Sequence, residues 1–200
     1  MLLEAADSQL VLVDYQARLM PAVFEGPQVL ANAVRLARIA SLLEVPVWGT
    51  EQNPSKLGPN PPEIRELCQK TLPKMHFGAV ADGLADCLRP VVRPASGNAR
   101  SLPKHLQKTP ARAPERNSIV LAGCEAHVCL LQTALGLIEQ ELDVWVVTDA
   151  CSSRTERNRD AAFDRLAGAG AELVTTEMVA FEWLRTAEHK LFRDVQALIK

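Results

Sequence analysis

The sequence predicts an α/β fold, a three-layer Rossmann-like sandwich in which helices cover both faces of a mostly parallel six-stranded sheet. Six short segments have strand character, and segments with helical spacing of apolar residues separate most of them. Strands that alternate with helices in this way form parallel sheets, because each helix returns the chain to the same end of the sheet. The chain has 200 residues, 48% of them hydrophobic, so it can bury a full core, and we expect a single domain over residues 1–200.

The first three predicted strands differ in regularity. Residues 9–14 (QLVLVD) form a continuous apolar run that ends in a carboxylate, which is typical of a strand buried on both faces. A second strand is expected at residues 45–50, with Pro46 near its start because proline cannot donate to a sheet. Residues 71–77 are expected to form a short, irregular third strand. The segments between them predict a helix at 27–43, a loop with four prolines at 51–62, one or two helical turns at 62–68, and a helix at 79–88.

Regular alternation of strands and helices returns in the last third of the chain. Gly170 follows one of the expected helices, as glycine commonly does at a helix end. The expected strands are residues 118–122, 143–149 and 171–175, and the expected helices are 128–141, 154–169, 177–185 and 189–200.

Residues 89–116 differ in composition from the rest of the chain. They contain five prolines and seven lysines or arginines but one acidic residue, Glu115. We expect this basic, proline-rich stretch to be an exposed insertion or a flexible loop. A basic patch that attracts an anionic substrate or partner is the alternative, although runs of charge are usually only solvated.

Composition argues against several classes of protein. The net charge of −2 speaks against nucleic acid or a membrane surface as the main partner. No apolar run reaches the ~18 residues of a membrane span, and the acidic N-terminus does not resemble a signal peptide. Five cysteines without a C-x-x-C motif are best explained as free thiols in a reducing compartment. We therefore expect a cytoplasmic protein whose main partner is neither nucleic acid nor a membrane.

Three residues with complementary chemistry lie at predicted strand ends: Asp14, Lys74 and Cys129. The carboxyl ends of parallel strands share one edge of the sheet, which is where such folds bind ligands. Asp14 can remove the thiol proton, Lys74 can stabilise negative charge, and backbone N–H groups near Cys129 can hold an oxyanion. Because Cys129 lies where a helix begins, helix amides can also favour its thiolate.

Each of these three residues also has a purely structural interpretation. Asp14 could cap the segment that follows it, Lys74 could be an ordinary surface lysine, and Cys129 could be a small buried hydrophobe. The presence of all three at strand ends favours function. Three further cysteines are expected to be packing residues: Cys68, Cys87 and Cys151.

Four motifs in the expected order resemble the isochorismatase-like cysteine hydrolase superfamily over nearly the whole chain, apart from the basic insertion. They are LVLVDYQ at 10–16, LPKMHF at 72–77, GCEAHVC at 123–129 and VVTDACSS at 146–153. Within that superfamily, the sequence is most similar to the isochorismatase domain-containing proteins.

This resemblance implies a mechanism and an assembly. Asp14, Lys74 and Cys129 would form a catalytic triad, with the cysteine as the nucleophile that forms a covalent thioester. The peptide bond between Cys124 and Glu125 would be cis, and the backbone amides of Glu125 and Cys129 would form the oxyanion hole. The resemblance also implies a homo-oligomer.

The sequence departs from the metal-binding members of the superfamily. The nicotinamidases bind a metal through an Asp-x-His after the second strand, whereas residues 50–53 here are TEQN and no Asp-x-His occurs. The four histidines lack the spacing of metal ligands. We therefore expect no metal and no other cofactor. Isochorismatase proper cleaves a vinyl ether and lacks the cysteine, so Cys129 favours C–N cleavage.

Four more residues are candidates for the substrate pocket. His127 lies two residues before Cys129, but Asp14 already fills the role of base in the resemblance, so we expect His127 to pack or to line the pocket. Tyr15, Trp48 and Phe77 lie near predicted strand ends and could form pocket walls, although aromatic residues more often belong to the core. 

Three functions are compatible with these residues. The first is a cysteine-dependent hydrolase that cleaves the amide or ureido C–N bond of a small molecule. The second is a non-catalytic oligomeric scaffold or small-molecule binding protein of the same fold. The third is redox sensing by Cys129 with Cys124 or Cys151, against which the lack of a C-x-x-C motif argues.

Overall fold

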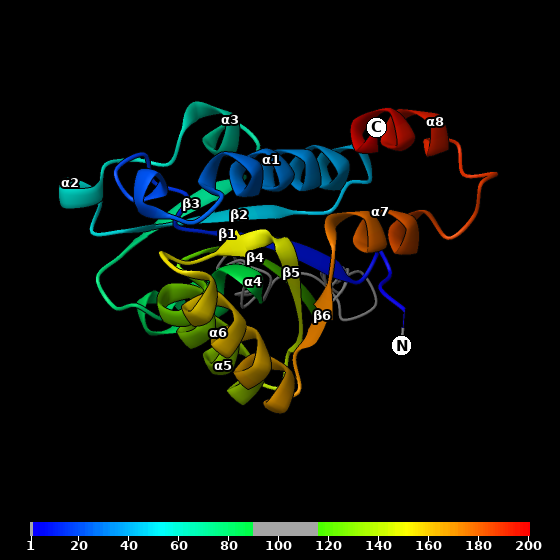
Figure 1. Cartoon of the computed structure of the whole chain (residues 1–200). Coiled ribbons are helices and arrows are strands. Elements are labelled where there is room, and N and C mark those ends of the chain that lie inside the picture. Colours follow the sequence, from blue (N-terminus) through cyan, green and yellow to red (C-terminus); the bar gives the residue numbers. More distant parts are fainter. Residues whose placement is uncertain (1, 90–115) are drawn as a thin grey trace, which may run out of the picture.

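A six-stranded sheet runs through the protein in the order β3-β2-β1-β4-β5-β6, and all its pairings are parallel (Figure 1). The computed structural model describes residues 2–89 and 116–200. The predicted basic insertion therefore lies outside the described residues, except for its two end residues. The strands are β1 (Ser8–Val13), β2 (Val47–Gln52), β3 (Lys70–Lys74), β4 (Ser118–Cys124), β5 (Asp143–Ser152) and β6 (Glu172–Val174).

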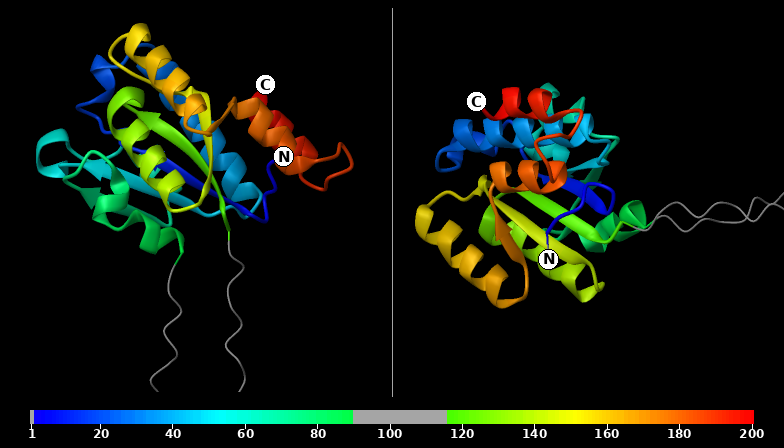
Figure 2. Two further views of the ribbon diagram at one scale, coloured as in Figure 1. Left: turned by 90° about the horizontal axis from the view of Figure 1, so that it is seen from below. Right: turned by 90° about the vertical axis from the view of Figure 1, so that its right-hand side faces the viewer.

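Helices cover both faces of this sheet, which confirms the predicted three-layer architecture (Figures 1 and 2). One layer contains α1 (Gly26–Leu42), α3 (Pro62–Arg65), α7 (Thr176–Leu184) and α8 (Phe192–Ile199), and the other contains α4 (Leu84–Leu88), α5 (Leu131–Glu139) and α6 (Glu156–Gly168). Four short elements complete the described chain: η1 (Met20–Ala22), α2 (Pro54–Leu57), η2 (Ala79–Asp82) and the π-helical turn η5 (Ala126–Leu130). Within the described ranges, no helix combines the length and the apolarity that a membrane crossing needs.

The core lies on both sides of the two central strands. All six residues of β1 are buried, as its continuous apolar sequence predicts, and β4 is buried from Ile119 onward. Two helices on opposite faces begin with threonine caps. The Thr155 hydroxyl accepts a hydrogen bond from the Asn158 amide, and the Thr175 hydroxyl accepts one from the Met178 amide.

Several predicted boundaries move for identifiable reasons. β2 begins at Val47, two residues later than expected, because Pro46 has no N–H to donate to the ladder. β3 ends at Lys74, and residues 75–77 leave the sheet as a loop. The single helix expected at residues 79–88 is divided by Gly83, whose φ of 93° interrupts the helix between η2 and α4.

Gly123 sets the distance between the two central strands where they approach the site. A Cβ atom at this position would lie 2.3 Å from the Val13 carbonyl oxygen and 2.5 Å from the Val13 Cβ. Only a residue without a side chain therefore lets β4 pass this close to the end of β1.

We expect Gly123→Ala to destabilise the protein by about 1–3 kcal/mol, because the added methyl group forces the two strands apart. Urea unfolding measures this loss. Gly168→Ala is the matched control, because a Cβ there meets no atom within 4 Å, and it should not destabilise the protein. Equal stability of the two variants would contradict the close-approach argument.

Candidate active site

Asp14 directly follows β1 and turns its carboxylate into the interior. Its backbone has φ 53°, in the left-handed region that aspartate tolerates better than most residues. The Thr50 hydroxyl on β2 donates a hydrogen bond of 2.7 Å to Oδ1. The Asp14 side chain has no exposed surface, so its charge needs partners inside the protein.

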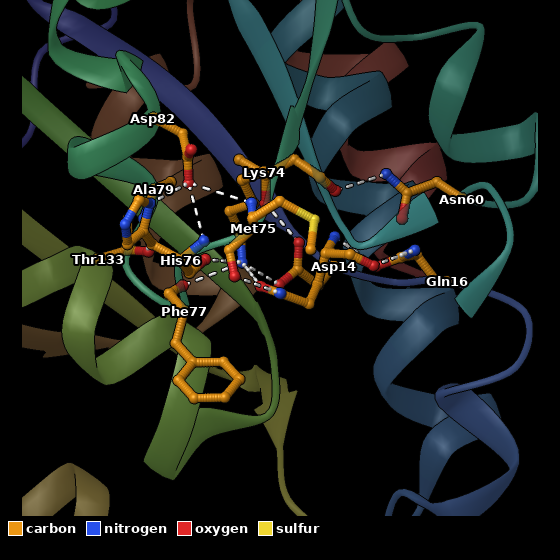
Figure 3. Close-up of polar contacts among 12 residues, drawn as sticks. Asp14, Gln16, Asn60, Lys74, Met75, His76, Phe77, Ala79, Asp82 and Thr133 are labelled. Atoms are coloured by element: carbon orange, nitrogen blue, oxygen red, sulfur yellow. Dashed lines mark hydrogen bonds and ion pairs between the residues drawn. The ribbon is translucent and has the colours of Figure 1, made fainter. Parts of the chain in front are cut away.

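Lys74 supplies the opposite charge from the last residue of β3. Its Nζ lies 2.7 Å from Asp14 Oδ2, and the lysine side chain is also fully buried. Because β2 lies between β1 and β3, the lysine reaches across one strand to form this pair (Figure 3). Nζ donates to Gln52 Oε1 at 2.7 Å, to the Phe77 carbonyl at 2.9 Å and to the His76 carbonyl at 3.3 Å. These oxygens offset the desolvation of the ammonium group.

One carboxylate oxygen of Asp14 keeps an unused lone pair. The contact between Lys74 Nζ and Oδ2 is short enough for an ion pair, but Oδ2 accepts no hydrogen bond from any described residue. A carboxylate oxygen has two lone pairs, so Oδ2 can accept a further proton, such as that of the Cys129 thiol, beside the Lys74 ammonium.

Cys129 lies on the π-helical turn η5, which follows β4, and is 6% exposed. Burial and then the charge of Asp14 raise the pKa of the Cys129 thiol to about 12, while the charge of Lys74 lowers it, so both charges act on the sulfur. The structure thus brings together the three residues predicted from strand ends. The influence of helix amides on the thiol stays a prediction, and burial is the largest influence on its pKa, which it raises.

The loop before Cys129 contains one feature that the resemblance implied. The peptide bond between Cys124 and Glu125 is cis. The oxyanion hole formed by Glu125 and Cys129 stays a prediction.

His127 does not face the thiol as a base would. Its Nδ1 lies 2.9 Å from Ser153 Oγ and 3.5 Å from Glu125 Oε2, and its Nε2 lies 3.4 Å from Asn158 Nδ2. Both ring nitrogens are therefore engaged by this polar cluster, and the ring is half-buried.

The predicted aromatic pocket residues lie in different environments. Tyr15 is fully buried, and its hydroxyl donates to the Ala150 carbonyl. Trp48 is the second residue of β2, and its Nε1 donates to Gln9 Oε1 near the start of β1. The structure does not bring Trp48 to the site, because the site lies at the carboxyl ends of these strands. The Phe77 ring is 53% exposed and points away from Asp14 and Lys74 (Figure 3).

Sequence reasoning missed the polar residues that hold the ion pair. Thr50 and Gln52 end β2, between the strands of Asp14 and Lys74, and each binds one of the two charges. Gln16 in turn accepts from the Gln52 amide at 2.7 Å and donates to the Gln52 carbonyl at 3.0 Å. The order of the first three strands could have identified these residues, because the end of β2 lies between Asp14 on β1 and Lys74 on β3. In the part of the chain that the structure describes, no three His, Cys, Asp or Glu residues are grouped to hold a metal ion.

Comparison with known proteins identifies the family. Residues 8–178 match the isochorismatase domain. The chain belongs to the isochorismatase family. Isochorismatase domain-containing protein 2A of Mus musculus is 35% identical over 193 residues, which cover 96% of this chain and 82% of the mouse protein.

Solved structures of similar proteins share the fold of this isochorismatase-family chain. The MAR1 ribonuclease of Caenorhabditis elegans has a TM-score of 0.83 and 29% identity, covering 100% of this chain and 92% of that one. YcaC of Escherichia coli, described as an octameric hydrolase of unknown specificity, has a TM-score of 0.78 and 24% identity, with 100% and 95% coverage. The all-parallel sheet flanked by helices is therefore the family's fold.

We expect the buried pair to show strong energetic coupling. Lys74→Met and Asp14→Asn should each destabilise the protein by about 3–5 kcal/mol, because each leaves a buried charge without its partner. The double variant should lose clearly less than the sum of the two, since it leaves neither charge behind. Urea unfolding of all four proteins measures the coupling, and simple additivity would show that the two charges act independently.

Proposed function

We propose that this protein is a cysteine-dependent hydrolase that cleaves an amide or ureido C–N bond of a small molecule through a covalent thioester. Asp14 is the general base and acid, Lys74 is the fixed cation, and Cys129 is the nucleophile. The single observation that carries the proposal is the fully buried Asp14–Lys74 pair, because the charges of both residues act on the Cys129 thiol.

The first half of the reaction forms the thioester. Asp14 takes the Cys129 proton as the sulfur attacks the carbonyl carbon, and the carbonyl oxygen gains the negative charge. The amides of Glu125 and Cys129 stabilise that oxygen, while Lys74 stabilises the anionic groups beside it. Asp14 then passes the proton to the leaving nitrogen, and the C–N bond breaks with release of ammonia or an amine.

The second half restores the free thiol. Asp14 removes a proton from a water molecule as its oxygen attacks the thioester carbon. The C–S bond breaks, the acid product leaves, and the sulfur recovers the proton from Asp14. Lys74 keeps its charge throughout, since its role is electrostatic.

The burial of the site supports a small substrate. Asp14 and Lys74 side chains have no exposed surface, and Cys129 has 6%. A compact carbonyl group can approach the sulfur at such a site, whereas a folded macromolecule cannot. Free thiols suit this chemistry, and all five cysteines are unpaired, which supports a reducing compartment such as the cytoplasm.

A screen of small amides and carbamoyl compounds for ammonia release tests the proposal. Cys129→Ala should abolish turnover, and Asp14→Asn should lower it by at least about 100-fold because the proton carrier is lost. Cys68→Ala is the matched control and should keep full activity, because Cys68 packs under β2 and β3 outside the site. Turnover that survives in Cys129→Ala would refute the role of Cys129 as the nucleophile. If the wild-type protein hydrolyses none of the compounds, the non-catalytic scaffold is favoured instead.

Ribonuclease activity is a second candidate, favoured by the name of the C. elegans relative. The buried triad does not suit it, because a strand of RNA needs an open groove to reach the reacting groups. Incubation of RNA with the wild-type protein and with Cys129→Ala decides between the two. RNA cleavage that is lost in Cys129→Ala would replace the amidase proposal.

We also propose that the protein is a homo-oligomer. The octameric YcaC supports this proposal, because it shares the fold. Light scattering coupled to size-exclusion chromatography should give a mass of at least twice the 21.9 kDa chain. A mass of one chain at micromolar concentration would refute the proposal.

A further inference from the structure

The loop of residues 75–77 holds Lys74 through its backbone. The carbonyls of His76 and Phe77 accept from Nζ, at 3.3 and 2.9 Å. The side chains of Met75 and Phe77, however, are 65% and 53% exposed, so they contribute little burial that would fix the loop. Another group must keep these two carbonyls in place.

Asp82 is such a group, and it acts beside Gln52, whose Nε2 donates to the Met75 carbonyl at 2.9 Å. Its Oδ2 accepts hydrogen bonds from the Met75 amide at 3.2 Å and the His76 amide at 3.0 Å, and it lies 3.2 Å from His76 Nδ1 (Figure 3). Bonds from backbone amides to a carboxylate are among the stronger hydrogen bonds. Partial burial opposes ionisation, but the hydrogen bonds from His76 and Met75 prevail and lower the pKa of Asp82. The carboxylate is thus charged at neutral pH.

The turn that carries Asp82 is anchored to the helix that follows the nucleophile. Asp82 ends η2, and the first amide of η2, that of Ala79, donates to Thr133 Oγ1 on α5 at 3.1 Å. Gly78, just before the turn, packs so closely on α5 that a Cβ would lie 3.2 Å from the Gln132 carbonyl oxygen. Since α5 continues directly from the turn of Cys129, η2 connects the lysine loop to the cysteine helix.

We propose that Asp82 is a positioning residue that fixes Lys74 relative to Cys129. It holds the amides of residues 75 and 76, the carbonyls of the same loop hold the Lys74 ammonium, and the ammonium acts on the thiol. The inference rests on the proposed function, in which Lys74 stabilises the negative charge that forms at the sulfur and the substrate. Asp82 itself does not touch the reacting atoms.

The rate at which iodoacetamide alkylates Cys129 tests this role without any substrate. The thiolate is the reactive form, and Lys74 lowers the pKa of the Cys129 thiol. Asp82→Ala releases the loop, weakens the effect of Lys74 and should slow alkylation of Cys129 about three- to tenfold between pH 7 and pH 10. Asp82→Asn keeps one acceptor oxygen for the two amides and should recover part of the rate. Mass spectrometry follows each cysteine, and the rate at Cys68 should not change.

Two comparisons separate positioning from a general loss of structure. Asp86→Ala removes a nearby acidic residue from the exposed surface of α4 and should leave the rate at Cys129 unchanged. A loop that merely opened would expose the sulfur and speed alkylation, so an equal or faster rate in a folded Asp82→Ala variant would overturn the proposal. If Asp82→Ala fails to fold, Asp82→Asn and His76→Ala are measured in its place, and each should slow the alkylation of Cys129 by a smaller factor. An unchanged alkylation rate in both variants would also overturn the proposal.

The amidase assay then separates this inference from the proposed function. With an amide substrate, Asp82→Ala should lower kcat and leave KM nearly unchanged, because the loop carbonyls bind Lys74 and not the substrate. Slowed alkylation in a protein that hydrolyses no amide would reject the hydrolase and keep the positioning role. Normal alkylation and normal kcat in Asp82→Ala would reject the positioning role and keep the hydrolase.

Discussion

The ion pair between Asp14 and Lys74 is the constraint on which the rest of the site depends. Two opposite charges lie 2.7 Å apart with no exposed surface, and either charge alone would cost several kcal/mol in that place. The pair requires β2 to lie between β1 and β3, and it requires neutral polar groups at the end of β2. Thr50 and Gln52 supply those groups, one for each charge. The charges of the site therefore depend on the order of the first three strands in the sheet.

The same pair bears on the reaction proposed for Cys129, in which a thiol with a raised pKa gives its proton to Asp14. When the proton moves from Cys129 to Asp14, negative charge leaves the carboxylate and appears on the sulfur. Lys74 neighbours both groups, so the site holds one negative and one positive charge before and after the transfer. A low dielectric strongly penalises the creation of a new charge, but it penalises the relocation of an existing one beside the same cation far less. Burial and reactivity are compatible for this reason.

The sequence predicted what depends on local patterns and missed what depends on three-dimensional register. Local patterns located all six strands, from the continuous apolar run at residues 9–14 to the short, irregular strand at 71–77, and chemistry at strand ends selected Asp14, Lys74 and Cys129. The raised pKa of the Cys129 thiol could not be predicted, because the burial of its turn depends on the packing of the whole fold. Gly83 divides a predicted helix through a left-handed conformation that no periodicity reveals. Asp82 was missed because its partners are backbone amides, which look alike in every sequence.

In the loop after Lys74, the backbone and the side chains have different roles. Its backbone carbonyls bind the ammonium, so the position of Lys74 does not depend on which side chains the loop carries. Met75 and Phe77 meanwhile expose their side chains to whatever approaches the protein. Exchange of these side chains can then change what is recognised near the site and leave the charges in place, provided that Asp82 still holds the backbone. A fixed ion pair beside exchangeable side chains suits a fold that different proteins use for different functions.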